Sequence, residues 1–205
     1  MKTSKIFFVT ILYRFASWLR WLAHGRNQQL ISHKLPQRAD TLANIKIEWL
    51  ITYGIKGIIL DLDNTIISED DRYISPGAEN WIRQAKLAGL VFFILSNSKR
   101  RHRVKYWSKR LKIQAINPAR KPFPMAFKTA IAQMNLYPNQ VVVIGDSVHT
   151  DIIGAWVLGS CHIQVATLPH PPRWWEKLAG KWVQIPYPST TELWDFEDVY
   201  SDEYC

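Results

Sequence analysis

Short runs of apolar residues alternate along the chain with longer stretches in which apolar residues recur at helical spacing. The runs predict buried strands over residues 57–61, 90–95, 113–116, 140–145 and 161–165. Helices are expected between them, over residues 77–89, 99–111, 122–135 and 151–158. Strands that alternate in this way with helices predict the α/β class, with a Rossmann-like, doubly wound parallel sheet covered by helices on both faces.

The first of these strands runs directly into acidic residues. Asp61 and Asp63 lie one residue apart, so in an extended chain both side chains point to one face, whereas a turn after Asp61 places them on either side of the strand mouth. Crowded carboxylates are costly unless a cation or a reaction needs them. Open α/β sheets bind their ligands at the carboxyl ends of the strands, so we expect a site here.

Polar residues of types that take part in catalysis also follow two later strands. Ser96 and Asn97 come after the strand 90–95, and Lys121 precedes the helix 122–135. The strand 140–145 ends in Asp146, with Asp151 five residues further on. Taken singly, a pair of aspartates fits an ordinary turn and a lysine fits the surface. Four such segments, in order and each beside its predicted strand or helix, favour one composite site.

These segments together resemble the four motifs of the haloacid dehalogenase (HAD) superfamily, which are DxDxT, a strand-end Ser or Thr, a Lys, and GDxxxxD. Residues 61–65 match the first motif and residues 145–151 match the last. The sequence around these motifs looks like the YqeG branch of subfamily IIIA, which includes phosphatidylglycerophosphate phosphatases. The resemblance covers roughly residues 30–170 and implies the HAD-like hydrolase fold.

The resemblance also implies a role for each matching residue. Asp61 corresponds to the nucleophile that forms an aspartyl-phosphate, and Asp63 to the acid that protonates the leaving alcohol and then activates water. Ser96, Asn97 and Lys121 correspond to the groups that bind the phosphoryl oxygens.

Mg²⁺ is the cofactor that the resemblance implies. Its expected ligands are Asp61, the backbone carbonyl of Asp63, and Asp146, because Mg²⁺ prefers oxygen ligands. Thr65 and Asp151 are expected to support the site, with Asp151 positioning the lysine or a metal-bound water.

The spacing between the motifs leaves no room for a cap domain. Only a short polar stretch, residues 68–72, follows the first motif, and residues 97–121 hold just one helix and one strand. We therefore expect an uncapped, open site, which suits a phosphate carried on a membrane, a protein or a polynucleotide better than a small metabolite.

Composition and the two ends of the chain indicate the class of partner that the protein binds. The net charge is +9, which favours anionic partners, either a membrane or nucleic acid. Residues 1–30 form a basic, aromatic segment whose pattern is typical of an interfacial membrane helix, the alternative being a helix packed on the domain. Residues 31–170 form the phosphatase domain, and residues 171–205 form a Trp-rich and then acidic tail that fits either a membrane interface or the flank of the domain.

Several further residues have smaller expected roles. Cys161 and Cys205 make no disulfide framework, which indicates a reducing compartment, with Cys161 as a small buried apolar residue. The basic run over residues 99–105 is either a solvated helix face or a surface that meets an anionic substrate. His102 and His149 lie near the motif loops, but no metal-ligand spacing links the histidines of the chain.

The function expected from the sequence is a Mg²⁺-dependent phosphatase that dephosphorylates phosphatidylglycerophosphate at an anionic membrane surface. The protein would then be peripherally attached to the membrane on its cytoplasmic side. The alternatives are a phosphatase of phosphoproteins or polynucleotide ends, and a non-catalytic binding protein that keeps the fold. The sequence predicts no oligomeric state.

Overall fold

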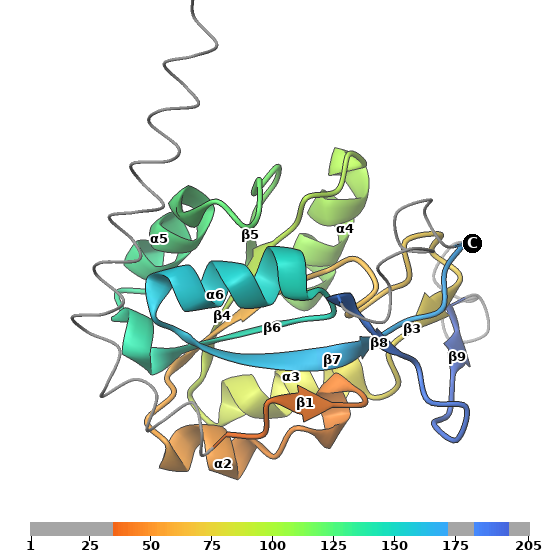
Figure 1. Cartoon of the computed structure of the whole chain (residues 1–205), viewed down its shortest axis with the longest axis horizontal. Helices are drawn as coiled ribbons and strands as arrows, with labels where there is room; N and C mark the ends of the chain where they lie inside the picture. The colour runs from red at the N-terminus through yellow and green to blue at the C-terminus, as the bar shows by residue number, and fades with distance from the viewer. Residues whose placement is uncertain (1–34, 172–182, 197–205) are drawn as a thin grey trace, which may run out of the picture.

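The computed structural model describes residues 35–171 and 183–196. A parallel sheet forms its centre, with strand order β1-β7-β6-β2-β4-β5 and with β8 pairing β7 (Figure 1). The strands of this sheet are β1 (Arg38–Ala39), β2 (Gly57–Leu60), β4 (Val91–Leu95), β5 (Gln114–Ile116), β6 (Val141–Gly145), β7 (Cys161–Thr167) and β8 (Ile185–Pro186). The helices are α2 (Ile47–Thr52), α3 (Ala78–Leu87), α4 (Arg101–Leu111), α5 (Pro124–Gln133) and α6 (Ile153–Leu158).

Helices cover both faces of the sheet, as a doubly wound fold requires. Alternate residues of β2 point to opposite faces, so Ile58 and Leu60 join one apolar cluster and Ile59 joins another. The first cluster includes side chains of α3 and α4, and the second includes side chains of α5 and α6. Figure 1 shows α6 and α2 on opposite sides of β7. The fold class predicted from the alternating pattern is confirmed.

The sheet reverses its winding direction beside β2. From β2 the chain moves outward to β4 and β5, and it then returns to the other side of β2 to form β6 and β7. The carboxyl ends of β2 and β6 therefore meet at the switch point, which is where open α/β sheets form ligand sites.

The five predicted core strands and four predicted helices are all present, with small shifts at their ends. The largest difference precedes α6, because a π-helical turn, Val148–Ile152, carries the chain from β6 into that helix. Strand β7 also extends two residues past its predicted end, because β8 pairs with Ala166 and Thr167. Cys161 lies buried in β7, as predicted, and burial raises its pKa to about 11.

Four strands of two residues each were not predicted. They are β1 and β8, which pair with β7, and β3 (Tyr73–Ile74) and β9 (Trp194–Asp195), which form a separate antiparallel pair. Two-residue strands are too short to show an alternating pattern. Through β8 and β9, residues 183–196 pack on the rest of the described domain.

Two further expectations concern the size of the loops and the ends of the chain. No cap domain follows the first motif or the strand β4 within the described residues, as the spacing predicted. The predicted membrane helix in residues 1–30, Trp174-Trp175 and the acidic end after residue 196 lie outside the described residues. Among the helices of residues 35–171 and 183–196, none is long and apolar enough to cross a bilayer.

Candidate active site

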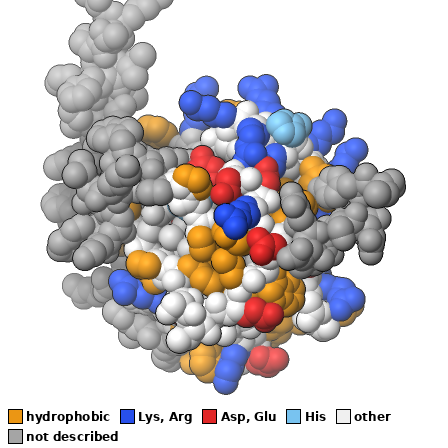
Figure 2. All heavy atoms as spheres, turned by 90° about the vertical axis from the view of Figure 1, so that its right-hand side faces the viewer, with side chains coloured by type: hydrophobic (Ala, Val, Ile, Leu, Met, Phe, Trp, Pro, Cys, Tyr) orange, Lys and Arg blue, Asp and Glu red, His pale blue; other side chains and the backbone are white. Residues whose placement is uncertain are grey.

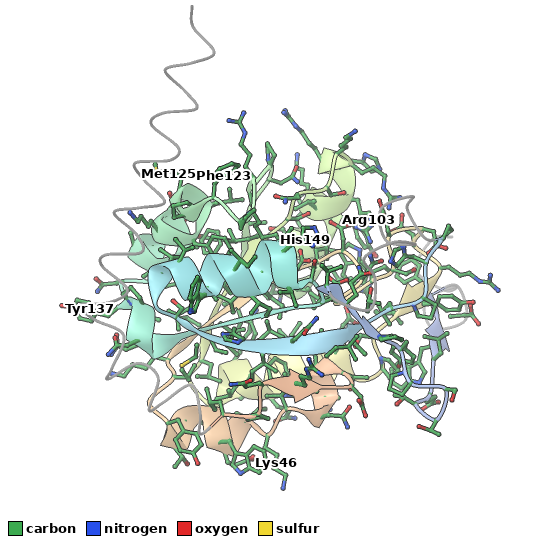
Figure 3. The ribbon with its side chains drawn as sticks, in the orientation of Figure 1. Lys46, Arg103, Phe123, Met125, Tyr137 and His149 are labelled. Carbon is green, nitrogen blue, oxygen red and sulfur yellow. The ribbon has the colours of Figure 1, made fainter. Side chains whose placement is uncertain are left out.

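The predicted site residues gather at the carboxyl ends of β2, β4 and β6. Asp61 follows β2, Ser96 follows β4 and Asp146 follows β6, and all three are buried. Figure 2 views the molecule from the side toward which these ends point, and acidic and basic side chains cluster near its centre. Figure 3 labels Arg103 and His149 toward this end and Tyr137 at the opposite end.

Lys121 joins two of the buried carboxylates. Its Nζ lies 2.6 Å from Asp61 Oδ1 and 2.6 Å from Asp151 Oδ1. Asp61 Oδ1 also accepts the backbone N–H of Leu62 at 2.7 Å, which leaves Asp61 Oδ2 for a reacting phosphorus or a cation. The expectation that Asp151 positions the lysine thus agrees with the geometry. Although burial by itself lowers the pKa of Lys121, Asp151 and Asp61 raise it above its usual value.

Gly145 explains how Asp151 can reach this position. A Cβ atom at residue 145 would lie 2.4 Å from Asp151 Cγ, which is far closer than real contacts allow. The π-helical turn after β6 folds Asp151 back against this glycine. The glycine of the GDxxxxD motif therefore makes room for the second carboxylate of the same motif.

Asp63 is held by two donors from different elements. Its Oδ2 accepts the Ser96 hydroxyl at 3.0 Å, and its Oδ1 pairs with the Arg103 guanidinium. Ser96 Oγ in turn accepts the backbone N–H of Ser98 at 3.0 Å. The two donors fix the orientation of the Asp63 carboxylate beside the strand ends.

Arg103 is a site residue that sequence reasoning missed. It lies on α4 within the predicted basic run, but its side chain is only 4% exposed. Besides Asp63 it pairs with Asp71, and its Nη2 donates to the carbonyl oxygen of Ser68 at 2.8 Å. Arg100 also pairs with Asp71. These two arginines therefore hold the loop after the first motif. The interpretation of residues 99–105 as one solvated or substrate-facing surface is wrong for the buried Arg103.

The helical pattern around Arg103 could have revealed this. Val104, Trp107 and Leu111 are the buried side chains of α4, and Arg103 lies beside Val104 on the inward side. An arginine on the inward side of a helix needs a buried acidic partner, and the first motif offers carboxylates. Lys99, Arg101 and Lys105 are exposed, as a solvated basic face requires.

The loop between the first motif and α3 turns sharply at Asn64. This residue adopts a left-handed backbone with φ of 59°, a conformation that Asn tolerates better than most residues. Its Oδ1 accepts the backbone N–H of Glu69 at 2.7 Å, which ties the loop to the turn. Thr65 is buried, and its hydroxyl has no hydrogen-bond partner among the described residues. Thr65 therefore makes no hydrogen bond to the acidic cluster among the described residues, and its supporting role stays a prediction.

The side chain of Asn97 hydrogen-bonds to the backbone of Lys121. Its Oδ1 accepts the Lys121 N–H at 2.8 Å and its Nδ2 donates to the Lys121 carbonyl at 3.0 Å. Both polar atoms of the side chain are thus used to place the lysine. This geometry favours a positioning role for Asn97 over the direct phosphate contact that was predicted.

The two histidines near the motif loops have separate surroundings. Nδ1 of His149 lies 2.7 Å from Ser147 Oγ, so the ring hydrogen-bonds to the residue that follows Asp146. His102 is exposed on α4. Neither belongs to the cluster of metal-ligating groups that the described residues form.

Three carboxylates lie close enough together to hold a metal ion. One oxygen each of Asp61, Asp146 and Asp151 can be chosen so that the three atoms lie within 4.8 Å of one another. Burial, with the nearby carboxylate of Asp151, raises the pKa of Asp146 to about 7. Burial, partly offset by Lys121, also raises the pKa of Asp61 well above its usual value. Crowded, buried oxygen donors of this kind fit a hard divalent cation such as Mg²⁺.

This set contains the two carboxylates that were predicted as ligands, Asp61 and Asp146, and adds Asp151. The third predicted ligand, the backbone carbonyl of Asp63, is not a side-chain group and stays a prediction. The side chain of Asp63 points to Ser96 and Arg103.

The raised pKa of Asp146 predicts how metal-free stability depends on pH. The folded protein holds a proton at Asp146 up to its pKa of about 7, whereas the unfolded chain releases it near the usual aspartate pKa of 3.8. Stability from this group therefore falls as pH rises from about 4 to 7. We expect Asp146→Asn to stabilise the metal-free protein at pH 8, by at most about 4 kcal/mol, and this gain to vanish near pH 4.

Urea unfolding in EDTA at several pH values measures this difference. Asp40→Asn is the control, because Asp40 is exposed. A gain that does not change with pH would mean that Asp146 stays ionised throughout.

Comparison with known proteins finds similarity to one family of hydrolases. Residues 118–183 match the model of the HAD-hydrolase-like family. Over 111 residues the chain is 40% identical to a Bacillus subtilis (strain 168) protein named "Probable phosphatase YqeG". The chain is therefore similar in sequence to HAD hydrolases over part of its length. This match covers 54% of the chain and 64% of the relative, so it spans less than two thirds of that protein.

Solved structures give weaker similarities. An uncharacterized protein from Listeria monocytogenes serotype 4b has 18% identity and a TM-score of 0.46, over 72% of this chain and 96% of that one. A HAD phosphatase from Thermococcus onnurineus has 19% identity and a TM-score of 0.42, over 49% of this chain and 50% of that one.

Proposed function

We propose that this protein is a Mg²⁺-dependent phosphomonoester hydrolase that acts through an aspartyl-phosphate. One observation carries the proposal: Asp61 lies at the switch point, with Oδ1 fixed by Lys121 and Leu62 and with Oδ2 left for attack. A non-catalytic binding protein would not need three crowded, buried carboxylates at this point, because their mutual repulsion costs stability.

The residues divide the reaction into two displacements. In the first, Asp61 Oδ2 attacks phosphorus, the phosphorus–oxygen bond to the alcohol breaks, and Asp63 gives its proton to the leaving oxygen. In the second, water attacks the aspartyl-phosphate, its proton passes to Asp63, and the bond to Asp61 breaks. In this structure the Asp63 carboxylate pairs with Arg103, so it must move away from Arg103 before it donates a proton to the leaving oxygen.

Charge balance accounts for the other groups. Asp61, Asp146 and Asp151 would hold the cation, which when bound lets the anionic nucleophile approach an anionic phosphate. Lys121 supplies the fixed positive charge for the phosphoryl oxygens. Ser96 keeps Asp63 in place by its 3.0 Å hydrogen bond.

We further propose phosphatidylglycerophosphate at an anionic membrane surface as the substrate. The net charge of +9 and the absence of a cap among the described residues support a large anionic partner. The start of α5 adds support, since Phe123 and Met125 are 59% and 70% exposed and closely follow Lys121. Exposed apolar side chains beside a catalytic lysine suit a lipid surface. Figure 3 shows both residues projecting from α5.

Phosphate release from a panel of substrates tests the activity and the substrate separately. The panel contains phosphatidylglycerophosphate in vesicles, glycerol phosphate, a phosphopeptide and a 3′-phosphorylated oligonucleotide, each with Mg²⁺ and with EDTA. We expect Mg²⁺-dependent release from all that fit the site and the highest kcat/KM for the lipid. If the oligonucleotide or peptide is clearly preferred, the lipid assignment fails, while release that EDTA does not affect would overturn the metal assignment.

The exposed apolar pair predicts a selective effect on membrane substrate. We expect the double variant Phe123→Ser/Met125→Ser to lower kcat/KM for vesicle-borne lipid by about tenfold, because each buried apolar side chain contributes roughly 1.5–3 kcal/mol of transfer free energy and insertion is partial. Glycerol phosphate hydrolysis should change less than twofold, since neither side chain belongs to the acidic cluster.

Tyr137→Ser is the matched control, because Tyr137 is 72% exposed but follows the C-terminal end of α5, whereas Phe123 and Met125 lie at the start of that helix (Figure 3). An equal loss for lipid and for glycerol phosphate in the double variant would show that the pair shapes the site and does not contact the membrane.

A further inference from the structure

A residue far along the sequence touches the acidic cluster. Gln184 Nε2 donates to Asp146 Oδ2 at 3.0 Å. Gln184 lies immediately before β8, in the part of the chain that the sequence assigned to a membrane-facing or flanking tail. Of the three clustered carboxylates, Asp146 is the one that this segment approaches.

The backbone fixes Gln184 at this place. Ser147 and Gln184 form an antiparallel bridge, and β8 pairs with β7 one residue later. Gln164, which is buried in β7, donates from Nε2 to both the Asp146 carbonyl at 2.9 Å and the Val183 carbonyl at 3.2 Å. The amide of one glutamine thus ties the backbone of Asp146 to the backbone beside Gln184.

The other end of the same segment is anchored on the loop of the first motif. Strand β9 pairs with β3, and the N–H of Phe196 donates to the Arg72 carbonyl at 2.8 Å. The ring of Phe196 lies 5.7 Å from the ring of Trp107 on α4. Backbone pairing therefore holds residues 183–196 at both ends. The position of Gln184 does not depend on its own side-chain hydrogen bond alone.

We infer that Gln184 is a positioning residue of the metal centre, and that the C-terminal segment thereby completes the active site. The inference rests on the proposed use of a divalent cation. With Oδ2 held by the amide, the Asp146 carboxylate has a fixed orientation, and Oδ1 is the oxygen presented to the cation. A neutral donor suits this task, because a lysine or arginine in its place would compete with the cation for the carboxylate charge.

Loss of the amide donor should weaken metal binding more than it weakens the fold. Partners of metal-ligating carboxylates typically contribute about 10- to 100-fold in metal affinity. We expect Gln184→Leu and Gln184→Met in the full chain to bind Mg²⁺ about tenfold more weakly by titration calorimetry. At saturating Mg²⁺ their kcat should return to within about twofold of wild type, because the ligands themselves are intact.

Two comparisons decide the outcome. Gln133→Leu, at the exposed end of α5, removes the same side chain away from the site and should leave Mg²⁺ affinity unchanged. The Tm in EDTA shows whether each variant is folded. If leucine packs poorly at position 184, the methionine variant, which keeps the length of the glutamine side chain, gives the answer. Wild-type affinity in both folded Gln184 variants would overturn the inference. If the wild-type protein itself bound no Mg²⁺, the proposed metal function would fail, and the inference with it.

Discussion

Asp61→Asn should abolish turnover while leaving the protein folded. The amide has nearly the shape of the carboxylate but cannot act as the nucleophile at phosphorus. Loss of a catalytic nucleophile costs about 10³-fold or more in kcat, so phosphate release should fall to the background of the assay. The metal-free variant should be at least as stable as wild type, because burial and the neighbouring carboxylates together outweigh Lys121 in their effect on the charge of Asp61, and Lys121 keeps Asp151 as a partner.

A comparison with the second aspartate separates the two displacements. Asp63→Asn should also be slow, but phosphate should remain attached to Asp61, because activation of water is lost. Mass spectrometry of the quenched protein detects the added phosphate. Turnover by Asp61→Asn at a rate near wild type would exclude the covalent route, and the exposed Asp40→Asn provides the control for handling and purity.

Lys121→Met should damage both activity and stability. The side chain of Lys121 is only 2% exposed and lies 2.6 Å from oxygens of Asp61 and Asp151. Removing one partner of a buried ion pair destabilises a protein by about 3–5 kcal/mol, since the remaining charge is left uncompensated. Loss of the positive charge at the phosphoryl group should lower kcat by about 10²- to 10³-fold.

Urea unfolding in EDTA and in excess Mg²⁺ measures the stability effect. The deficit should be smaller in Mg²⁺, because the cation supplies part of the missing positive charge to the same carboxylates. Lys56→Met, which changes an exposed lysine, should match wild type in both conditions. An unchanged unfolding free energy for Lys121→Met would contradict a stabilising role for its ion pairs with Asp61 and Asp151.

The central part of the fold could be predicted because each strand and helix there is long enough to show its period. The strand β2 is apolar throughout, and α3 buries Trp81, Ile82 and Ala85 on one side. The motif residues follow from the same pattern, since they lie at strand ends that a parallel sheet brings together. For this reason the sequence predicts Asp61, Ser96 and Asp146 at the ends of β2, β4 and β6, where the structure has them.

What the sequence could not show depends on contacts between distant segments. The inward direction of Arg103 is hidden because its basic neighbours are exposed, and a charge run usually marks a solvated face. The use of both Asn97 amide atoms on Lys121 requires the loop geometry. Gln184 has no motif around it, and only the pairing of β8 with β7 brings it to Asp146.

The position of β2 also has a consequence for synthesis on the ribosome. β2 pairs with β4 on one side and β6 on the other, and β6 is made much later than both. Until β6 emerges, the nascent chain carries a fully apolar strand with one row of backbone N–H and C=O groups unpaired, the kind of edge that recruits other chains. Rapid overproduction should therefore favour inclusion bodies, and slower translation or an abundant chaperone should raise the soluble yield.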